Sequence, residues 1–398
     1  HDAAEYLAEY VPSADFAFNL YAEQIDIDAV QSAINPSAGK QLSVGLNIET
    51  GEMLVAVHHL VIDALSWPVL IQDLLGSYQQ EMGVDSYAFA SKTHNQADWY
   101  EALESLHISH RQSEFWNAQR AEPAFAEGSA KEAESKGIHK HRYHITKELA
   151  EPLLASTQAF ARMSKEQTLM ALSALAVKQI TSANEIVIHR ESHGRFSESF
   201  GLDLSRSVNW HTALFPQKVA LSVSISELLA SVKDGSHAIT DGGLSYSAGV
   251  VQQQWQYQDH VDVLFNFLGR ATQADVKGAE LGEFGLWRPE DAKADAAIVL
   301  NISETDEGFD VELEFSLSAL SESECDAYVH HLESAIKAVT EHCTSNSAIL
   351  TQADAPNTNL SLMTLSHVSG NAHQLPHQIL PLSTLQQGLY FHAQLSQD

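Results

Sequence analysis

Residues 41–67 read QLSVGLNIETGEMLVAVHHLVIDALSW, and this stretch decides the class of fold. Two β-rich runs flank the turn residues Glu49–Glu52, which predicts a hairpin whose second strand is buried. From Ser66 to Gln80 the apolar residues recur at helical spacing. The polar residues between His58 and Trp67 therefore lie in a strand-to-helix loop, a common place for binding and catalytic side chains.

The rest of the chain continues the mixture of strands and helices. Residues 96–120 predict one amphipathic helix, and the charged, small-residue stretch 121–136 reads as a linker between lobes. Ser164 is expected to cap a helix. The further predicted strands are 141–145, 185–189, 261–267, 297–302 and 309–315, and the further helices are 149–161, 164–179 and 321–342. The fold class is therefore α/β.

The length and net charge of the chain limit the classes of function that it can have. A chain of 398 residues predicts two lobes or domains. Twenty-two Lys and Arg against 52 Asp and Glu give a net charge of −30, which argues against nucleic acid and anionic lipid as partners. The longest apolar run is too short to span a bilayer.

The cysteines and the first residues bear on location. Cys325 and Cys343 have no metal-binding or disulfide-framework spacing, so both are expected to be reduced, in a cytoplasmic setting. The chain starts at His1 with no secretory leader pattern, and we expect it to be part of something longer.

The paired histidines His58 and His59 are the strongest local signal, although alone they fit equally a buried core histidine beside an exposed one. The segment HHLVIDALSW resembles the second signature, HHxxxDxxSW, of the epimerization domains of nonribosomal peptide synthetases. Three later segments resemble that family in order and spacing: ESHGR (191–195) its EGHGR, SRSVNWHT (205–212) its SRTVGWFT, and FNFLG (265–269) its FNYLG. GLSYSAG (243–249) more weakly resembles its glycine-tyrosine loop.

Several positions depart from the family pattern. Ala64, Ser192 and Asn209 stand where the family has glycine, and His211 replaces an aromatic residue, so altered loop geometry is expected. The family's opening motif should lie well before the paired histidines, so the first lobe is expected to be N-terminally shortened.

The resemblance implies a domain organisation. It covers roughly residues 40–345 and implies two chloramphenicol-acetyltransferase-like lobes with mixed sheets, arranged as a V-shaped pseudo-dimer with a tunnel between them. We assign residues 1–125 to the first lobe and 126–345 to the second. Residues 346–379, polar and without periodicity, read as an interdomain linker. Residues 380–398 resemble the start of a following condensation domain, PLSxLQQGxxFH.

The implied activity is inversion at the Cα of an aminoacyl or peptidyl thioester, from L to D, within a multifunctional synthetase of secondary metabolism such as antibiotic biosynthesis. The thioester is carried on the phosphopantetheine arm of an upstream carrier domain. Carried over by position, His59 and Glu191 form the acid/base pair, with no metal and no bound cofactor. The alternative for Glu191 is a surface carboxylate paired with Arg190 or Arg195.

Five residues are expected to support this pair. Asp63 is implied to be structural and held by Arg195, and His58 to pack or orient. Asn266 could donate its amide to the thioester oxygen or simply cap a strand end, and Tyr246 belongs to the weaker loop match.

Two other functions remain open at this point. One is condensation-type amide synthesis, in which His59 would deprotonate an amine, although it leaves ESHGR and FNFLG unexplained. The other is a degenerate module that only docks carrier domains. The expected partners are the upstream carrier and the downstream condensation domain.

Overall fold

The computed structural model describes residues 16–84, 86–91, 93–125, 137–255, 261–270, 294–358, 360–371 and 376–395. The chain divides into two compact units. Within the described ranges, the first unit holds residues 16–105 and His193–Thr212, and the second holds Leu106–Ser192, 213–270 and 294–395. Each unit is described by itself.

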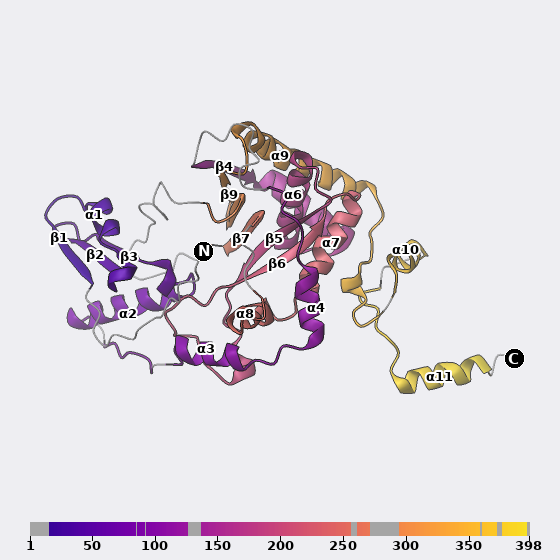
Figure 1. Ribbon diagram of the computed structural model, residues 1–398, viewed down its shortest axis with the longest axis horizontal. Coiled ribbons are helices and arrows are strands. Elements are labelled where there is room, and N and C mark those ends of the chain that lie inside the picture. Colours follow the sequence, from indigo (N-terminus) through magenta and orange to yellow (C-terminus); the bar gives the residue numbers. More distant parts are fainter. Residues whose placement is uncertain are drawn as a thin grey trace. The chain divides into compact units, whose positions relative to one another are not determined.

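The first unit is built on a three-stranded sheet (Figure 1) of order β1-β2-β3. β1 (Ala17–Tyr21) runs parallel to β2 (Leu42–Asn47), and β2 forms the expected hairpin with β3 (Met53–Val57). α1 (Ile27–Ser32) packs so closely that a Cβ on Gly45 would lie 2.8 Å from Val30. Beyond β3 come α2 (Ser66–Glu81) and α3 (Gln96–Ser105).

The second unit is built on a six-stranded mixed sheet (Figure 1) of order β4-β9-β8-β7-β5-β6. β5, β7 and β8 run parallel to one another, and β4, β6 and β9 are antiparallel to their neighbours. The strands are β4 (Ile138–Thr146), β5 (Glu185–Ser192), β6 (Ala213–Ala220), β7 (Val263–Arg270), β8 (Ile298–Thr305) and β9 (Gly308–Ser316).

Helices cover one face of this sheet and form the main core with it. Ile186, Ile188 and Phe265 point to that face, where Tyr328 donates or accepts a hydrogen bond of 2.8 Å with Ser173. The helices of the second unit are α4 (His110–Ala118), α5 (Lys147–Ala161), α6 (Lys165–Ile180, capped by Ser164 as expected), α7 (Ile225–Ala238), α8 (Leu244–Val251), α9 (Glu322–Ser345), α10 (Leu362–Asn371) and α11 (Thr384–Leu395). The α/β class is confirmed.

Residues 96–120 do not form the single helix that the sequence predicts. The structure ends α3 at Ser105 and starts α4 at His110, with Ser109 and Gln112 forming a reciprocal capping box at the new start. α4 belongs to the second unit, where Trp116 donates a hydrogen bond of 2.8 Å to Ser245. The units therefore separate at Ser105, whereas the sequence analysis set the limit of the first lobe at residue 125.

The segment 346–379, read as a linker from sequence, carries ordered structure in its described part. Leu350, Ala355 and Leu365 form a small buried cluster, and α10 lies within the segment. The Ile349 amide donates to the Phe160 carbonyl at the end of α5. The polar composition of this segment gave no indication that Leu350, Ala355 and Leu365 would be buried together.

Cys325 and Cys343 are both buried free thiols on α9. Their separation of five helical turns places them about 27 Å apart, far beyond the reach of a disulfide. Burial raises the pKa of both thiols, to about 12 for Cys325 and about 11 for Cys343. In the part of the chain that is described, no helix combines the length and apolar character needed to cross a membrane.

Candidate functional site

The paired histidines stand where β3 ends in the first unit, and their side chains have different environments. The His58 Nδ1 accepts a hydrogen bond of 3.2 Å from the Leu60 amide and so caps a short 3-10 turn over His59–Val61. His59 is exposed, and its ring lies edge-on to Trp210 with 5.9 Å between centroids. Because this hydrogen bond fixes the 3-10 turn, it also fixes the backbone position of the exposed His59.

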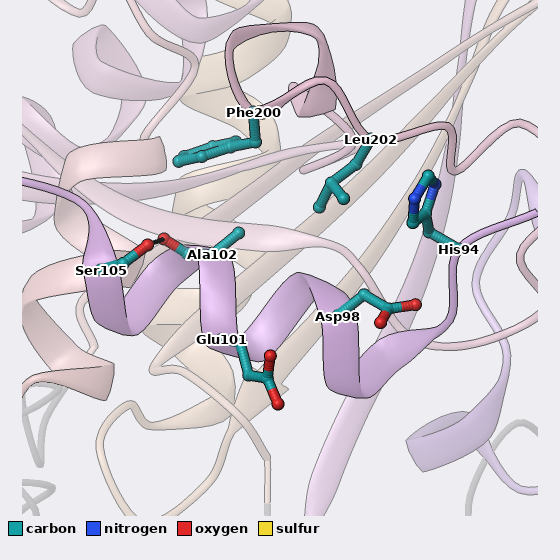
Figure 2. Close-up of a pocket in the computed structure, with 7 residues that line it drawn as sticks. All are labelled: His94, Asp98, Glu101, Ala102, Ser105, Phe200 and Leu202. Carbon is teal, nitrogen blue, oxygen red and sulfur yellow. Dashed lines mark hydrogen bonds between the residues drawn. The ribbon is translucent and has the colours of Figure 1, made fainter.

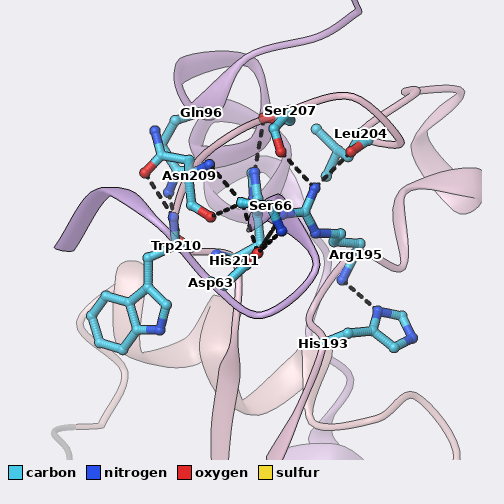
Figure 3. A network of polar contacts seen from close by, with 10 residues as sticks. All are labelled: Asp63, Ser66, Gln96, His193, Arg195, Leu204, Ser207, Asn209, Trp210 and His211. Atoms are coloured by element: carbon cyan, nitrogen blue, oxygen red, sulfur yellow. Dashed lines mark hydrogen bonds and ion pairs between the residues drawn. The ribbon is translucent and has the colours of Figure 1, made fainter. Parts of the chain in front are cut away.

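An ion pair ties this turn to the loop His193–Thr212 (Figure 3). The Arg195 Nη2 donates to both carboxylate oxygens of Asp63 at 2.7 and 2.9 Å, the partnership expected from sequence. The Arg195 Nη1 donates to the carbonyls of Leu204 and Ser207 at 2.7 and 2.8 Å. Because the side chains of Asp63 and Arg195 are only 4% and 8% exposed, water screens the pair little.

Ser66 and His211 complete this network (Figure 3). The Ser66 hydroxyl donates to Asp63 at 2.7 Å and accepts from the Asn209 amide at 3.1 Å. The His211 amide donates to Asp63 at 3.1 Å, and its ring Nε2 lies 2.9 Å from the Ser207 hydroxyl. None of these supporting contacts was predicted from sequence, although Ser66 lies in the HHxxxDxxSW signature.

The network shifts two pKa values. Burial by itself would raise the pKa of Asp63, but hydrogen bonds from Ser66, the His211 amide and Arg195 outweigh burial and hold that pKa below its usual range. Burial and the nearby Arg195 charge lower the pKa of His211 to about 4. His211 is therefore a neutral ring at neutral pH, and it packs edge-on to Trp99 as an aromatic residue would.

The replaced glycines impose no backbone strain. Among the described residues, the non-glycine positions with positive φ are Arg162, Gln253 and Asn357. Ala64, Ser192 and Asn209 thus have conformations that ordinary residues adopt. Ser192 also gains a contact, since its hydroxyl donates to the Gly242 carbonyl at 2.6 Å.

The first unit also contains an open pocket of about 520 Å³ (Figure 2). Residues of α3 line one side of it, Phe200 and Leu202 lie opposite, and His94 lies beside Leu202. Its lining residues include Asp98 and Glu101 and none of the site residues predicted from sequence. Its acidic lining disfavours an anionic ligand such as a phosphopantetheine arm.

In the second unit, Glu191 lies near the carboxyl end of β5 and is exposed. Side chains alternate along a strand, so Glu191 faces away from the packed helices, whereas Arg190 faces them. Arg190 forms a short ion pair with Glu166 and donates to Gln217 at 2.8 Å. The two arginines named as surface partners for Glu191 thus have carboxylate partners of their own, Glu166 for Arg190 and Asp63 for Arg195.

Asn266 lies on the same sheet face, in the neighbouring parallel strand. The register pairs Arg190 with Phe265, so Glu191 and Asn266 are the next residues of adjacent strands. Asn266 pairs in turn with Asn301 of β8, and its Nδ2 donates to Asn301 Oδ1 at 2.9 Å. Asn266 is inside β7, so it does not cap a strand end. Asn301 was not predicted as a site residue; its signal in the sequence is that it is the one polar residue in the apolar run 297–302.

Tyr246 belongs to a packed aromatic cluster. It lies in α8, is 4% exposed, and contacts Trp116 and Trp255 with ring centroids 5.1 and 5.9 Å away. Gly243 starts the helix at φ +85°, where a Cβ would lie 2.1 Å from the Phe215 ring. The weak loop match is therefore a glycine-started helix, and Tyr246 contributes packing.

The structure brings the predicted residues together in two groups. His58, His59, Asp63 and Arg195 are in the first unit, and Glu191, Asn266 and Tyr246 are in the second. Within the described ranges, no three His, Cys, Asp or Glu side chains gather in a way that could hold a metal ion. Proton transfer and hydrogen bonding are the chemistry that these groups offer.

A protein-family model matches most of the chain. The model described as the condensation domain matches residues 43–358. A linear gramicidin synthase of Brevibacillus parabrevis is 28% identical over 378 residues, which cover 87% of this chain and 7% of that protein. A surfactin synthase of Bacillus subtilis is 26% identical over 367 residues, covering 86% and 10%. The chain thus spans about a tenth or less of these relatives' length.

Solved structures show the same fold. The epimerization domain from the third module of tyrocidine synthetase B superimposes with a TM-score of 0.67 at 20% identity, covering 85% of this chain and 82% of that one. The condensation domain of a Monacolin K polyketide synthase gives 0.61 at 14% identity, covering 84% and 80%. The expected condensation-domain fold is confirmed.

Proposed function

Because the chain belongs to the condensation-domain family, we propose that it inverts the Cα of an aminoacyl or peptidyl thioester from L to D in nonribosomal peptide synthesis. The substrate arrives on the phosphopantetheine arm of an upstream carrier domain, and a downstream condensation domain takes the D-product. The protein itself needs no bound cofactor for this chemistry.

The reaction is a balanced proton exchange. One residue removes the Cα proton, and the electron pair moves into the thioester carbonyl as an enolate-like oxyanion. A second residue returns a proton to the opposite face, and the carbonyl re-forms. His59 and Glu191 are the proposed acid/base pair, with hydrogen-bond donors stabilising the oxyanion.

The position of Glu191 in the sheet is the main observation that supports this proposal. Glu191 stands near the carboxyl end of a parallel strand, on the sheet face away from the packed helices, with Asn266 next to it in register. Ligands of open α/β sheets bind at the carboxyl ends of the strands. A carboxylate able to move a proton therefore lies near the carboxyl end of β5, and an amide able to donate to an oxyanion lies beside it in register on β7.

Condensation-type amide synthesis is the second candidate. The matching family model is that of the condensation domain, and the histidine pair followed by Asp63 fits both reactions. In that reaction His59 removes a proton from an attacking amine, and Glu191 has no assigned role. A module that only docks carrier domains would perform neither reaction.

One experiment separates the three functions. The domain is incubated in deuterated solvent with a carrier loaded with an L-aminoacyl thioester, and the released acid is analysed for chirality and Cα deuterium. Epimerization gives a mixture of isomers with deuterium at Cα. Retention of the L-isomer without deuterium, together with amide formation when an acceptor-loaded carrier is added, identifies condensation, and no change in either assay identifies a docking module.

Glu191→Gln and His59→Ala then test the assignment of the pair. The variant lacking the base for the L-isomer is expected still to exchange the Cα proton of the D-thioester, and the other variant the reverse. Glu185→Gln, at the amino end of the same strand, and His330→Ala, at an exposed position of α9, serve as matched controls. Loss of exchange on both isomers in both folded variants contradicts a two-base mechanism.

A further inference from the structure

Two asparagines lie side by side at mid-strand positions of β7 and β8. Asn266 and Asn301 are register partners, and the Asn266 Nδ2 donates to Asn301 Oδ1 at 2.9 Å. Both lie on the face of the sheet opposite the main helix core, one position beyond the apolar pair Phe265 and Leu300 of that core. The register between β7 and β8 therefore places the Asn266 and Asn301 side chains next to each other.

The other end of the Asn266 amide is its oxygen, Oδ1. In the described part of the chain, Asn266 Oδ1 is a buried acceptor without a hydrogen bond. An unmade hydrogen bond on a buried polar atom is costly, so such an atom in a native structure calls for an explanation. A ligand with an N–H group would supply the missing donor.

In the orientation that the structure gives it, Asn301 sets which atom of the Asn266 amide is left unpaired. With Asn301 Oδ1 facing Asn266, turning the Asn266 amide alone would place its oxygen against Asn301 Oδ1, and two acceptors repel each other. With Nδ2 bound to Asn301, the diverging geometry of the amide directs Oδ1 away from β8. Asn301 thus fixes an acceptor in the strand next to Glu191.

We propose that Asn301 is a positioning residue that orients Asn266 so that its carbonyl oxygen accepts a hydrogen bond from the α-nitrogen of the residue being inverted. This inference rests on the proposed function, since it places the substrate Cα beside Glu191. The α-nitrogen is bonded directly to that Cα, so an acceptor in the adjacent strand is suitably near. The second Nδ2 hydrogen of Asn266 remains for the thioester oxygen.

A binding experiment tests the role of Asn301 without requiring turnover. The probes are two pantetheine amides, one bearing an N-acetyl aminoacyl group with an α N–H and one bearing its N-methyl counterpart, which has none. The wild-type domain is expected to bind the N–H probe about fivefold more tightly, the worth of one net hydrogen bond. Asn301→Leu is expected to lose this preference.

Matched variants distinguish orientation from general damage. Asn301→Asp keeps an acceptor for Asn266 Nδ2 and is expected to retain the preference, and Asn266→Leu is expected to abolish it. Thermal unfolding checks that each variant is folded. Equal binding of the two probes by the wild type, or an unchanged preference in folded Asn301→Leu, overturns the proposal.

The deuterium assay described above separates this inference from the proposed function. A domain that prefers the N–H probe through Asn301 but exchanges no Cα proton supports the nitrogen site and contradicts epimerization. A domain that exchanges the proton but shows no preference supports epimerization and contradicts the nitrogen site.

Discussion

At the scale of single residues, the ion pair between Asp63 and Arg195 makes a prediction about stability. Asp63→Ala leaves the buried Arg195 charge without its partner, and we expect the free energy of unfolding to fall by about 3–5 kcal/mol. Glu151→Ala, which removes an exposed ion pair with Lys147, should change it by less than about 1 kcal/mol. Urea denaturation measures both, and equal small effects would contradict a structural role for Asp63.

The Asp63 prediction also has a consequence for assays of activity. Loss of Asp63 should lower activity by disordering the turn that presents His59, so it would mimic loss of a catalytic group. Measuring exchange below the unfolding transition, where Asp63→Ala is still folded, separates the two effects. We expect residual Cα exchange in that variant and none on either isomer in the His59→Ala/Glu191→Gln double variant.

His211 makes the chain sensitive to acid. Its pKa is about 4 in the folded protein and about 6.5 in the unfolded chain, so between these values the unfolded chain binds more protons. The stabilisation is complete above pH 6.5 and is lost as the pH falls toward 4, by up to roughly 3 kcal/mol. His211→Phe should flatten this part of the stability-pH profile, whereas His330→Phe, at an exposed site, should leave it unchanged. An unaltered slope in His211→Phe would refute the assignment.

At the scale of elements, α8 depends on close packing over a glycine. A Cβ on Gly249 would lie 1.9 Å from the Trp255 ring, so Gly249→Ala must displace that ring from its stack on Tyr246. We expect a loss of about 1–3 kcal/mol in unfolding free energy and a change in tryptophan fluorescence. Gly370→Ala on α10, where nothing lies within 4 Å, should be neutral or slightly stabilising.

Elements were predictable where one signal dominated. The hairpin ending at Val57 and the helix capped by Ser164 followed from alternation and from a capping residue. The break between α3 and α4 was missed because the apolar spacing continues across it, although the Ser109-x-x-Gln112 capping box was present in the sequence. The spacing of apolar residues predicts which face of a helix is buried. The position at which a helix starts is predicted by its capping residues.

The candidate site was predictable only in part, for a similar reason. Motif position identified Asp63 and Arg195, and an ion pair between them is a simple consequence of opposite charge and burial. Asn301 was missed because its significance comes from strand register, which pairs it with Asn266 across 35 residues of sequence. Register between distant strands depends on the whole sheet, and no local pattern encodes it.

At the scale of the whole molecule, charges as well as apolar contacts hold the segment after α9 in place. Lys233 of α7, only 2% exposed, lies 2.7 Å from Asp354, which also caps the Thr351 amide at 2.9 Å. Arg162 lies 3.3 Å from the same carboxylate and donates to the carbonyls of residues 376 and 377. These contacts explain why the polar segment after α9 is part of the second unit.

The ion pairs of Asp354 predict that residues 346–358 resist proteolysis, and that this resistance depends on the buried pair with Lys233. Lys233→Met removes the buried 2.7 Å ion pair of Asp354 and leaves only the longer, partly exposed pair with Arg162 at 3.3 Å. Because this weakens the attachment of the segment, we expect it to detach more often and a nonspecific protease to cleave it at least about tenfold faster. The double variant Lys233→Met/Asp354→Leu buries no charge at this position and should recover part of the protection, because removing both partners of a buried pair costs less than removing one. Lys147→Met, at an exposed ion pair on α5, should be cleaved at the wild-type rate. Wild-type protection in Lys233→Met would mean that the apolar cluster around Leu350 holds the segment by itself, and the buried charges would then have no part in fastening it.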